Sequence, residues 1–152
     1  DVVLTLYYNH LKHGVEVIAR HCLEGLRPDF APGVQPGDVL VAGPNFGVGS
    51  SREQAAGALK ALGIAAVVAP SFAGLFFRNA FNLGLLLLTC PEAERLAEGE
   101  RVQVLARQAR LRRDDGRVLD CVPVPDFLLD MVDAGGLLPQ LKARFARGPS
   151  PP

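Results

Sequence analysis

Three short apolar segments, separated by two stretches of helical periodicity, place the strongest constraint on the fold of this 152-residue chain. The segments are residues 39–43 (VLVAG), 64–70 (IAAVVAP) and 85–89 (LLLLT). Their short length and their content of Val, Ile and Leu are typical of fully buried strands. The alternation of strand and helix predicts parallel strands joined by right-handed crossovers. We therefore expect an α/β fold with a mostly parallel sheet.

Two helices are expected between these strands. Residues 52–63 place apolar side chains on one face and end in Gly63. Residues 72–84 carry a broader apolar stripe, rich in phenylalanine, and end in Gly84. We expect Ser71 to cap the second helix, because serine is a favoured N-cap residue.

The part of the chain after Pro91 has a different pattern. A short amphipathic helix, three strands and two final helices are expected there, at residues 91–99, 101–106, 109–113, 117–124 and 125–145. Asp115-Gly116 is typical of a tight hairpin turn, so we expect a peripheral β-hairpin. Gly135 and Gly136 break the final helical stretch in two.

Composition indicates a single domain of ordinary globular type, with 49% hydrophobic and 21% charged residues. We expect this domain at residues 1–145, followed by a disordered tail at 146–152. The longest apolar runs, at 64–69 and 85–88, are far shorter than the roughly 20 residues of a membrane span. Sixteen basic residues balance sixteen acidic ones, so bulk charge favours neither nucleic acid nor an anionic membrane.

The three cysteines and three histidines do not form a recognisable metal motif. Cys22, Cys90 and Cys121 are widely spaced and too few for a four-cysteine zinc or iron–sulfur site. His10 and His13 share a helix face, but no acidic residue accompanies them at metal-ligand spacing. We therefore expect no metal in this chain and reduced cysteines. With no signal-peptide pattern, we expect a cytoplasmic protein.

Residues 43–54 (GPNFGVGSSREQ) combine glycines, two serines and an arginine where the first helix is expected to begin. A glycine-rich turn that leads into a helix N-terminus exposes backbone N–H groups, and the helix dipole adds positive potential there. Gly47 and Gly49 would let a ligand approach the backbone. Arg52 could bind a carboxylate or phosphate through two hydrogen bonds. The segment is therefore a candidate anion-binding site.

Ser50 and Ser51 have two interpretations at this point. In the field of a helix N-terminus a serine alkoxide is stabilised, as a catalytic base or nucleophile requires. Alternatively, each serine forms a structural capping box with Glu53 or Gln54. A nucleotide site is disfavoured, because the segment lacks the lysine of a P-loop and the third glycine of a dinucleotide fingerprint.

Further motif residues follow this segment at defined offsets. The set comprises Asn45, Gly47, Gly49, Ser50, Ser51, Arg52 and Glu53, then Ser71-Phe72-Ala73, Arg78-Asn79, Asn82 and Gly84. Together they resemble the small subunit of isopropylmalate dehydratase and homoaconitase, which is equivalent to the swivelling C-terminal domain of aconitases. Weaker similarity at residues 21–43 and 134–145 extends the resemblance over most of the chain. It implies a single swivelling β/β/α-type domain.

The resemblance implies a hydro-lyase subunit that acts on a malate-like hydroxy-polycarboxylate such as 3-isopropylmalate, in leucine biosynthesis. By carry-over, Ser50 would be the base that removes the proton next to a carboxylate. The residues assigned to substrate binding are Ser51, Arg52, Gly49, Gly47, Lys12 and His13. A [4Fe–4S] cluster is expected in a large partner subunit of the heterodimer, and none in this chain.

The sequence departs from the family pattern at four positions. Val48 replaces a common cysteine, Gln54 a histidine, Gly74 an arginine and Leu6 an aspartate. These departures motivate two alternatives: a non-catalytic or regulatory anion-binding paralogue, and a homoaconitase or methylmalate-type dehydratase small subunit.

Overall fold

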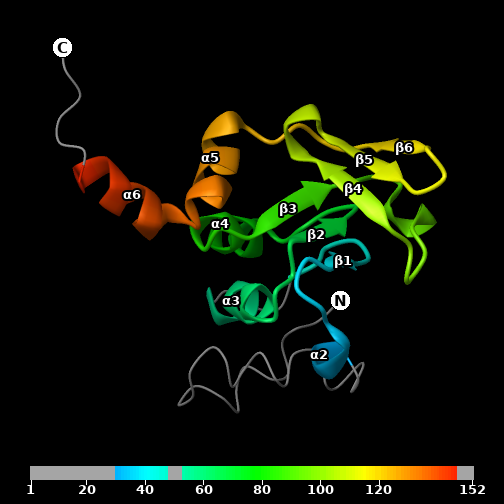
Figure 1. Ribbon diagram of the computed structural model, residues 1–152, viewed down its shortest axis with the longest axis horizontal. Helices are drawn as coiled ribbons and strands as arrows, with labels where there is room; N and C mark the ends of the chain where they lie inside the picture. The colour runs from blue at the N-terminus through cyan, green and yellow to red at the C-terminus, as the bar shows by residue number, and fades with distance from the viewer. Residues whose placement is uncertain (1–29, 48–52, 147–152) are drawn as a thin grey trace.

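The computed structural model of the protein describes residues 30–47 and 53–146 (Figure 1). In chain order the elements are α2 (Phe30–Gly33), β1 (Val39–Val41), α3 (Glu53–Ala61), β2 (Ala66–Ala69), α4 (Gly74–Asn82), β3 (Leu86–Thr89), the 3₁₀ turn η1 (Ala93–Arg95), β4 (Val102–Leu105), the 3₁₀ turn η2 (Ala106–Gln108), β5 (Arg110–Arg113), β6 (Val118–Asp120), α5 (Asp126–Ala134) and α6 (Leu137–Ala146). This combination of sheets and helices confirms the predicted α/β class.

The strands β1, β2 and β3 form a parallel sheet in that order. Val67 of β2 pairs with Leu40 on one side and with Leu87 on the other. All four residues of β2 are buried, because the strand has a neighbour on each edge and is covered on both faces. The three strands predicted from their apolar runs are therefore confirmed, with slightly shorter bounds.

The helices α3 and α4 connect these strands and contact each other. Leu59 of α3 and the rings of Phe76 and Phe81 of α4 are fully buried in the main core. Each such side chain contributes about 1.5–3 kcal/mol through its removal from water. The predicted phenylalanine-rich stripe is thus the surface through which α4 packs.

The strands β4, β5 and β6 form a separate antiparallel sheet, which Figure 1 shows next to the end of β3. In the turn between β5 and β6, Gly116 has a φ of +87°, and the Arg113 N–H donates to the Arg117 carbonyl at 2.7 Å. This confirms the predicted Asp-Gly turn. The two sheets are joined where the Val122 N–H donates to the Thr89 carbonyl at 2.8 Å.

The prediction that Ser71 caps the second helix is wrong. The N-cap of α4 is Ala73, which makes no side-chain capping bond, and the helix begins at Gly74. Residues 71–73 run beside Phe46 instead: the Phe46 N–H donates to the Ser71 carbonyl, and the Ala73 N–H donates to the Phe46 carbonyl. This pairing holds the segment extended and delays the start of the helix.

The amphipathic helix predicted at residues 91–99 is also wrong, because only the turn η1 forms there. The chain is extended at Leu96, and the Ala97 N–H donates to the Glu100 carboxylate at 2.9 Å. A side chain that accepts a bond from a nearby backbone N–H competes with helix formation in this way.

The predicted break between the final helices is confirmed, and it makes a close backbone contact. Gly135 ends α5 with a φ of +89°, and Gly136 follows with a φ of +123°. A Cβ on Gly84, in the turn before β3, would lie 2.5 Å from the Gly135 carbonyl carbon. The Lys60 ammonium of α3 donates to the carbonyls of Leu83 and Gly135, so it binds both turns.

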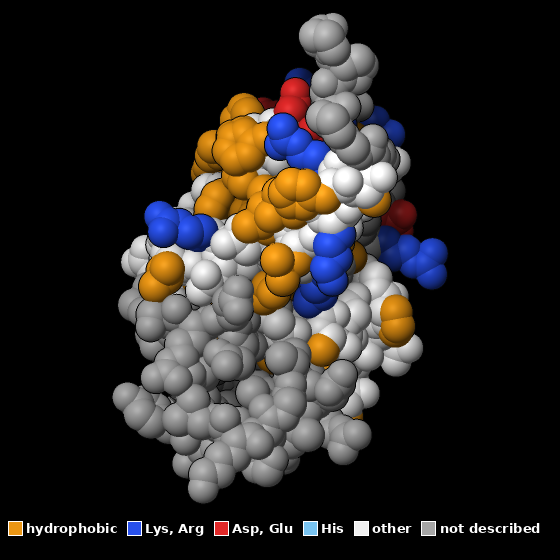
Figure 2. Space-filling model, turned by 90° about the vertical axis from the view of Figure 1, so that its left-hand side faces the viewer, with side chains coloured by type: hydrophobic (Ala, Val, Ile, Leu, Met, Phe, Trp, Pro, Cys, Tyr) orange, Lys and Arg blue, Asp and Glu red, His pale blue; other side chains and the backbone are white. Residues whose placement is uncertain are grey.

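The last helix, α6, extends to Ala146, one residue beyond the predicted domain end, and residues 147–152 of the predicted tail lie outside the described residues. Figure 2 views the molecule from the side of α6 and shows several clusters of hydrophobic side chains. Leu138 and Phe145 of α6 are among the exposed large hydrophobic residues. No helix among the described residues is long and apolar enough to cross a membrane.

Candidate functional site

The loop after β1 (residues 42–47) and the loop after β2 (residues 70–73) are bonded to each other. The two backbone bonds measure 3.1 Å and 2.9 Å and create one parallel bridge between Phe46 and Phe72. Ligands of open α/β sheets bind outside the carboxyl ends of the strands, where these paired loops lie. We therefore take the paired loops as the centre of the candidate site.

A pair of polar side chains strengthens this contact. The Asn45 N–H donates to Ser71 Oγ at 2.8 Å, and Ser71 Oγ in turn lies 3.3 Å from Asn45 Oδ1, to which it can donate. Asn45 has a φ of +58°, a left-handed conformation that asparagine tolerates better than most residues. The contact with Ser71 thus holds Asn45 in this left-handed conformation.

Gly47 follows Phe46 and is buried with a φ of +89°. A Cβ at this position would lie 2.4 Å from Cγ of Phe76, so only glycine lets the backbone pass over that ring. The Phe46 ring contacts the same Phe76 ring edge to face, with centroids 5.3 Å apart. The core therefore fixes the chain immediately before residue 48.

Of the predicted site residues, the structure describes only Gly47. Gly49, Ser50, Ser51, Arg52, Lys12 and His13 lie outside the described residues. The segment 48–52 is bounded by Gly47 on one side and by Glu53, the first residue of α3, on the other. The helix predicted at residues 52–63 is therefore present as α3, while its predicted start at the serines and the arginine lies outside the described residues.

The departure from the family pattern at Gly74 can be placed. Gly74 is the first residue of α4, and a Cβ built on it would meet nothing within 4 Å. The packing around residue 74 therefore leaves room for a Cβ and does not itself require glycine.

Sequence reasoning missed the role of Ser71 and Asn45 because their partnership spans 26 residues. The one available signal was Asn45 itself, placed between Pro44 and a phenylalanine, since asparagine in a turn favours the left-handed region. Nothing in the local sequence around Ser71 distinguishes a helix cap from a partner for a distant loop.

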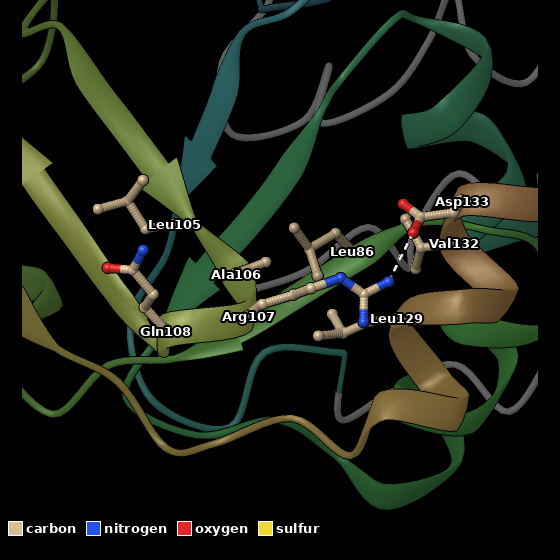
Figure 3. Close-up of a pocket in the computed structure, with 8 residues that line it drawn as sticks. All are labelled: Leu86, Leu105, Ala106, Arg107, Gln108, Leu129, Val132 and Asp133. Atoms are coloured by element: carbon tan, nitrogen blue, oxygen red, sulfur yellow. Dashed lines mark hydrogen bonds and ion pairs between the residues drawn. The ribbon is translucent and has the colours of Figure 1, made fainter.

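A cavity of about 310 Å³ lies elsewhere, between β3, η2 and α5 (Figure 3). Arg107 reaches across it to Asp133 at 2.8 Å and also contacts Asp130 at 3.0 Å and Asp126 at 3.5 Å. Two hydrogen bonds raise the pKa of Arg107 above its ordinary value. The bond to Asp130 has the larger effect, and the bond to Asp133 has the next largest. The charges around this cavity are therefore paired with one another, and we assign it no chemistry.

Cys90 and Cys121 are both free and buried. The pKa of the Cys121 thiol is raised to about 12, mainly by burial and to a smaller extent by the neighbouring Cys90. A thiol with a raised pKa stays protonated and is a poor nucleophile or metal ligand. The reduced state of the cysteines stays a prediction, and Cys22 lies outside the described residues. Among the described residues, no group of three or more His, Cys, Asp or Glu is placed to hold a metal ion.

Comparison with known proteins identifies the class to which this fold and these loops belong. Residues 27–93, which include both paired loops, match the model of the aconitase C-terminal domain. A solved structure titled 3-isopropylmalate dehydratase (leuD), from Methanocaldococcus jannaschii, superposes with a TM-score of 0.83 at 36% identity, covering 90% of this chain and 82% of that one. The fold is therefore that of an aconitase-type C-terminal domain.

The curated relatives define the family more closely. The 3-isopropylmalate dehydratase small subunit of Halothermothrix orenii is 41% identical over 144 residues, covering 93% of this chain and 87% of the relative. The 3-isopropylmalate dehydratase small subunit 1 of Methanopyrus kandleri is 49% identical over 134 residues, covering 87% and 79%. The chain belongs to the family of 3-isopropylmalate dehydratase small subunits.

Proposed function

We propose that this protein is the small subunit of a hydro-lyase that dehydrates and rehydrates a malate-like hydroxy-polycarboxylate, with 3-isopropylmalate as the leading substrate. In this proposal Ser50 is the base, and Ser51 and Arg52 hold substrate carboxylates together with Gly47 and Gly49. The observation that carries the proposal is the match to the dehydratase small subunits over almost the whole chain.

The structure supports this proposal through the two ends of the segment 48–52. Gly47 is held against Phe76 in the core, and α3 begins at Glu53. A helix N-terminus carries about half a positive charge, which favours a carboxylate ligand and an ionised serine. An arginine next to it offers a planar pair of donors that matches a carboxylate.

A cluster of iron and sulfur, which the resemblance implies, does not fit the described residues. Such clusters are held by cysteine thiolates, whereas Cys90 and Cys121 are buried and burial raises the pKa of the Cys121 thiol. We propose that the cluster belongs to a large partner subunit, with which this chain forms a heterodimer.

The proposal is tested by reconstitution with the large subunit of the same organism. The wild-type pair should hydrate or dehydrate 3-isopropylmalate. Ser50→Ala should lower kcat by about 10²–10⁴-fold, the usual contribution of a positioned base. Size-exclusion chromatography should show an unchanged complex. Full turnover by the Ser50→Ala complex would show that Ser50 is not the base.

Gly74 favours a second candidate function, a non-catalytic anion-binding paralogue. The arginine of the family pattern is missing at this position, although the Cβ of a larger residue would have room there. This candidate predicts that malate-like ligands raise the melting temperature of the complex without any turnover. A homoaconitase-type or methylmalate-type dehydratase would instead turn over its own substrate faster than 3-isopropylmalate. We propose that Lys12 and His13 lie in the loop that makes this choice, so substitutions there should change KM ratios between substrates.

A further inference from the structure

The helix α6, which Figure 1 shows at the edge of the molecule beside α5, has an exposed apolar face. Leu138 and Phe145 lie two helical turns apart, so they share one face, and they are 68% and 78% exposed. Leu141, on the same side of the helix, is only half-buried, and no residue of α6 is fully buried. Large apolar side chains exposed together on one face are typical of a protein–protein contact.

The charged side chains of α6 all have the same sign. The helix contains Lys142 and Arg144 and no acidic residue. None of the ion pairs among the described residues includes either side chain. A second α6 helix packed on this face would bring like charges together, whereas an acidic surface would complement it.

The helix α5 carries an acidic surface of this kind in the same molecule. Asp126, Asp130 and Asp133 recur at helical spacing on one face, and each carboxylate side chain is more than half exposed. All three contact a single cation, Arg107, so this cluster has two more carboxylates than guanidinium groups. Phe127, three residues before Asp130, is 65% exposed beside these charges. The outer surface of α5 is therefore both apolar and acidic.

The two surfaces are close enough in the chain to complement each other across a two-fold axis. The helices α5 and α6 follow one another and are in contact, with only Gly135 and Gly136 between them. We propose that this surface binds a second copy of the chain, with Leu138 and Phe145 of each α6 packed beside Phe127 of the α5 helix in the other copy. Each contact is then made twice, as in an isologous dimer. The basic α6 side chains face the acidic surface of α5.

This dimer leaves the candidate site accessible. The turn between α5 and α6 packs against Gly84, just before β3 begins, whereas the paired loops follow the ends of β1 and β2. Because these strands are parallel, α6 begins at the opposite end of the sheet from the paired loops. The inference therefore does not depend on the proposed function.

Sedimentation equilibrium of the full chain over a concentration series tests the apolar contact. The wild type should form a dimer. Leu138→Glu and Phe127→Glu should each raise its dissociation constant about thirtyfold or more, as the loss of a central interface contact does. The matched control is Val118→Glu, at an exposed valine of β6, which should leave the dissociation constant unchanged. Circular dichroism of each variant should match that of the wild type, since all three positions are exposed.

The charge complementarity is tested separately with Arg144→Glu. This variant should raise the dissociation constant about fivefold at low salt, because exposed ion pairs each contribute little. The difference from the wild type should shrink at high salt, where such charges are screened.

Four results would overturn the proposal. The first is a wild-type monomer throughout the concentration series. The second is a dimer that Leu138→Glu dissociates and Phe127→Glu does not, since α6 would then contact something other than α5. The third is an unchanged dissociation constant for Arg144→Glu at low salt. The fourth is a complex with the large subunit that holds one copy of each chain, because the large subunit would then cover this surface.

Discussion

Gly47 and Gly74 both lie in the candidate region, but a methyl group added at Gly47 would meet a crowded environment and one added at Gly74 an open one. Gly47 has a φ of +89°, and its missing Cβ would overlap the Phe76 ring. Gly74 is helical and faces open space. The same substitution at the two positions therefore isolates the effect of the local backbone and packing.

We expect Gly47→Ala to lower the free energy of unfolding by about 2–4 kcal/mol, because backbone strain and overpacking add. Gly74→Ala should raise it by about 0.5 kcal/mol, since alanine loses less conformational entropy in a helix. Urea unfolding followed by circular dichroism measures both values. Equal stability of the two variants would show that Phe76 moves aside at little cost.

At the level of elements, one ion pair connects the loop before β4 to strand β5. Arg113 donates to the Glu100 carboxylate from Nε at 2.5 Å and from a terminal nitrogen at 3.1 Å. Both side chains are only about one-sixth exposed, at 16% and 15%. The hydrogen bond from Arg113, with a second from the Ala97 N–H, lowers the pKa of Glu100 below its usual 4.5.

A lowered pKa in the folded state makes the contribution of Glu100 to stability depend on pH. The contribution is fully present above about pH 4.5, the ordinary value, and is lost as the pH falls through the lowered pKa. Glu100→Gln should therefore melt below wild type at pH 7. The difference between their melting temperatures should shrink below pH 4.5. Melting curves at pH 7 and pH 3.5 check this, and a constant difference would contradict it.

Across the whole molecule, Lys60 connects three parts that are far apart in sequence. It lies near the end of α3 and donates to carbonyls in the turn before β3 and in the turn after α5. The carbonyls at helix ends lack partners within their own helices, and a cation there is favoured by the helix dipole. Lys60 therefore stabilises two chain reversals at once.

Lys60→Met keeps most of the aliphatic side chain and removes the ammonium group. It should lower the free energy of unfolding by about 1 kcal/mol, as expected for the loss of solvent-accessible hydrogen bonds. Lys142→Met on α6, an exposed helical position, is the control and should change stability by less than about 0.5 kcal/mol. Chemical denaturation of both variants gives the comparison. Equal losses would remove any special role for Lys60.

The sequence predicted the three parallel strands, the hairpin turn and the final helix break, because burial and turn chemistry are local signals. It failed at Ser71, where a distant partner decided the conformation, and at residues 91–99, where a local bond from a backbone N–H to a side chain competed with the helix. Ser71 bonds to Asn45, 26 residues away, and Ala97 bonds to Glu100. The roles of Ser50, Ser51 and Arg52 stay predictions, since these residues lie outside the described part of the chain.

The contact between Gly84 and the pair Gly135 and Gly136 also limits how this family can diverge. A side chain at Gly84 would overlap the backbone of Gly135, and one at Gly136 would come within 2.6 Å of the Asn82 carbonyl oxygen. Neither turn can accept a larger residue while the other keeps its place. Two sites about fifty positions apart in the chain are therefore expected to stay glycine together, and a homologue with a bulky residue at one of them should carry α6 in a shifted orientation.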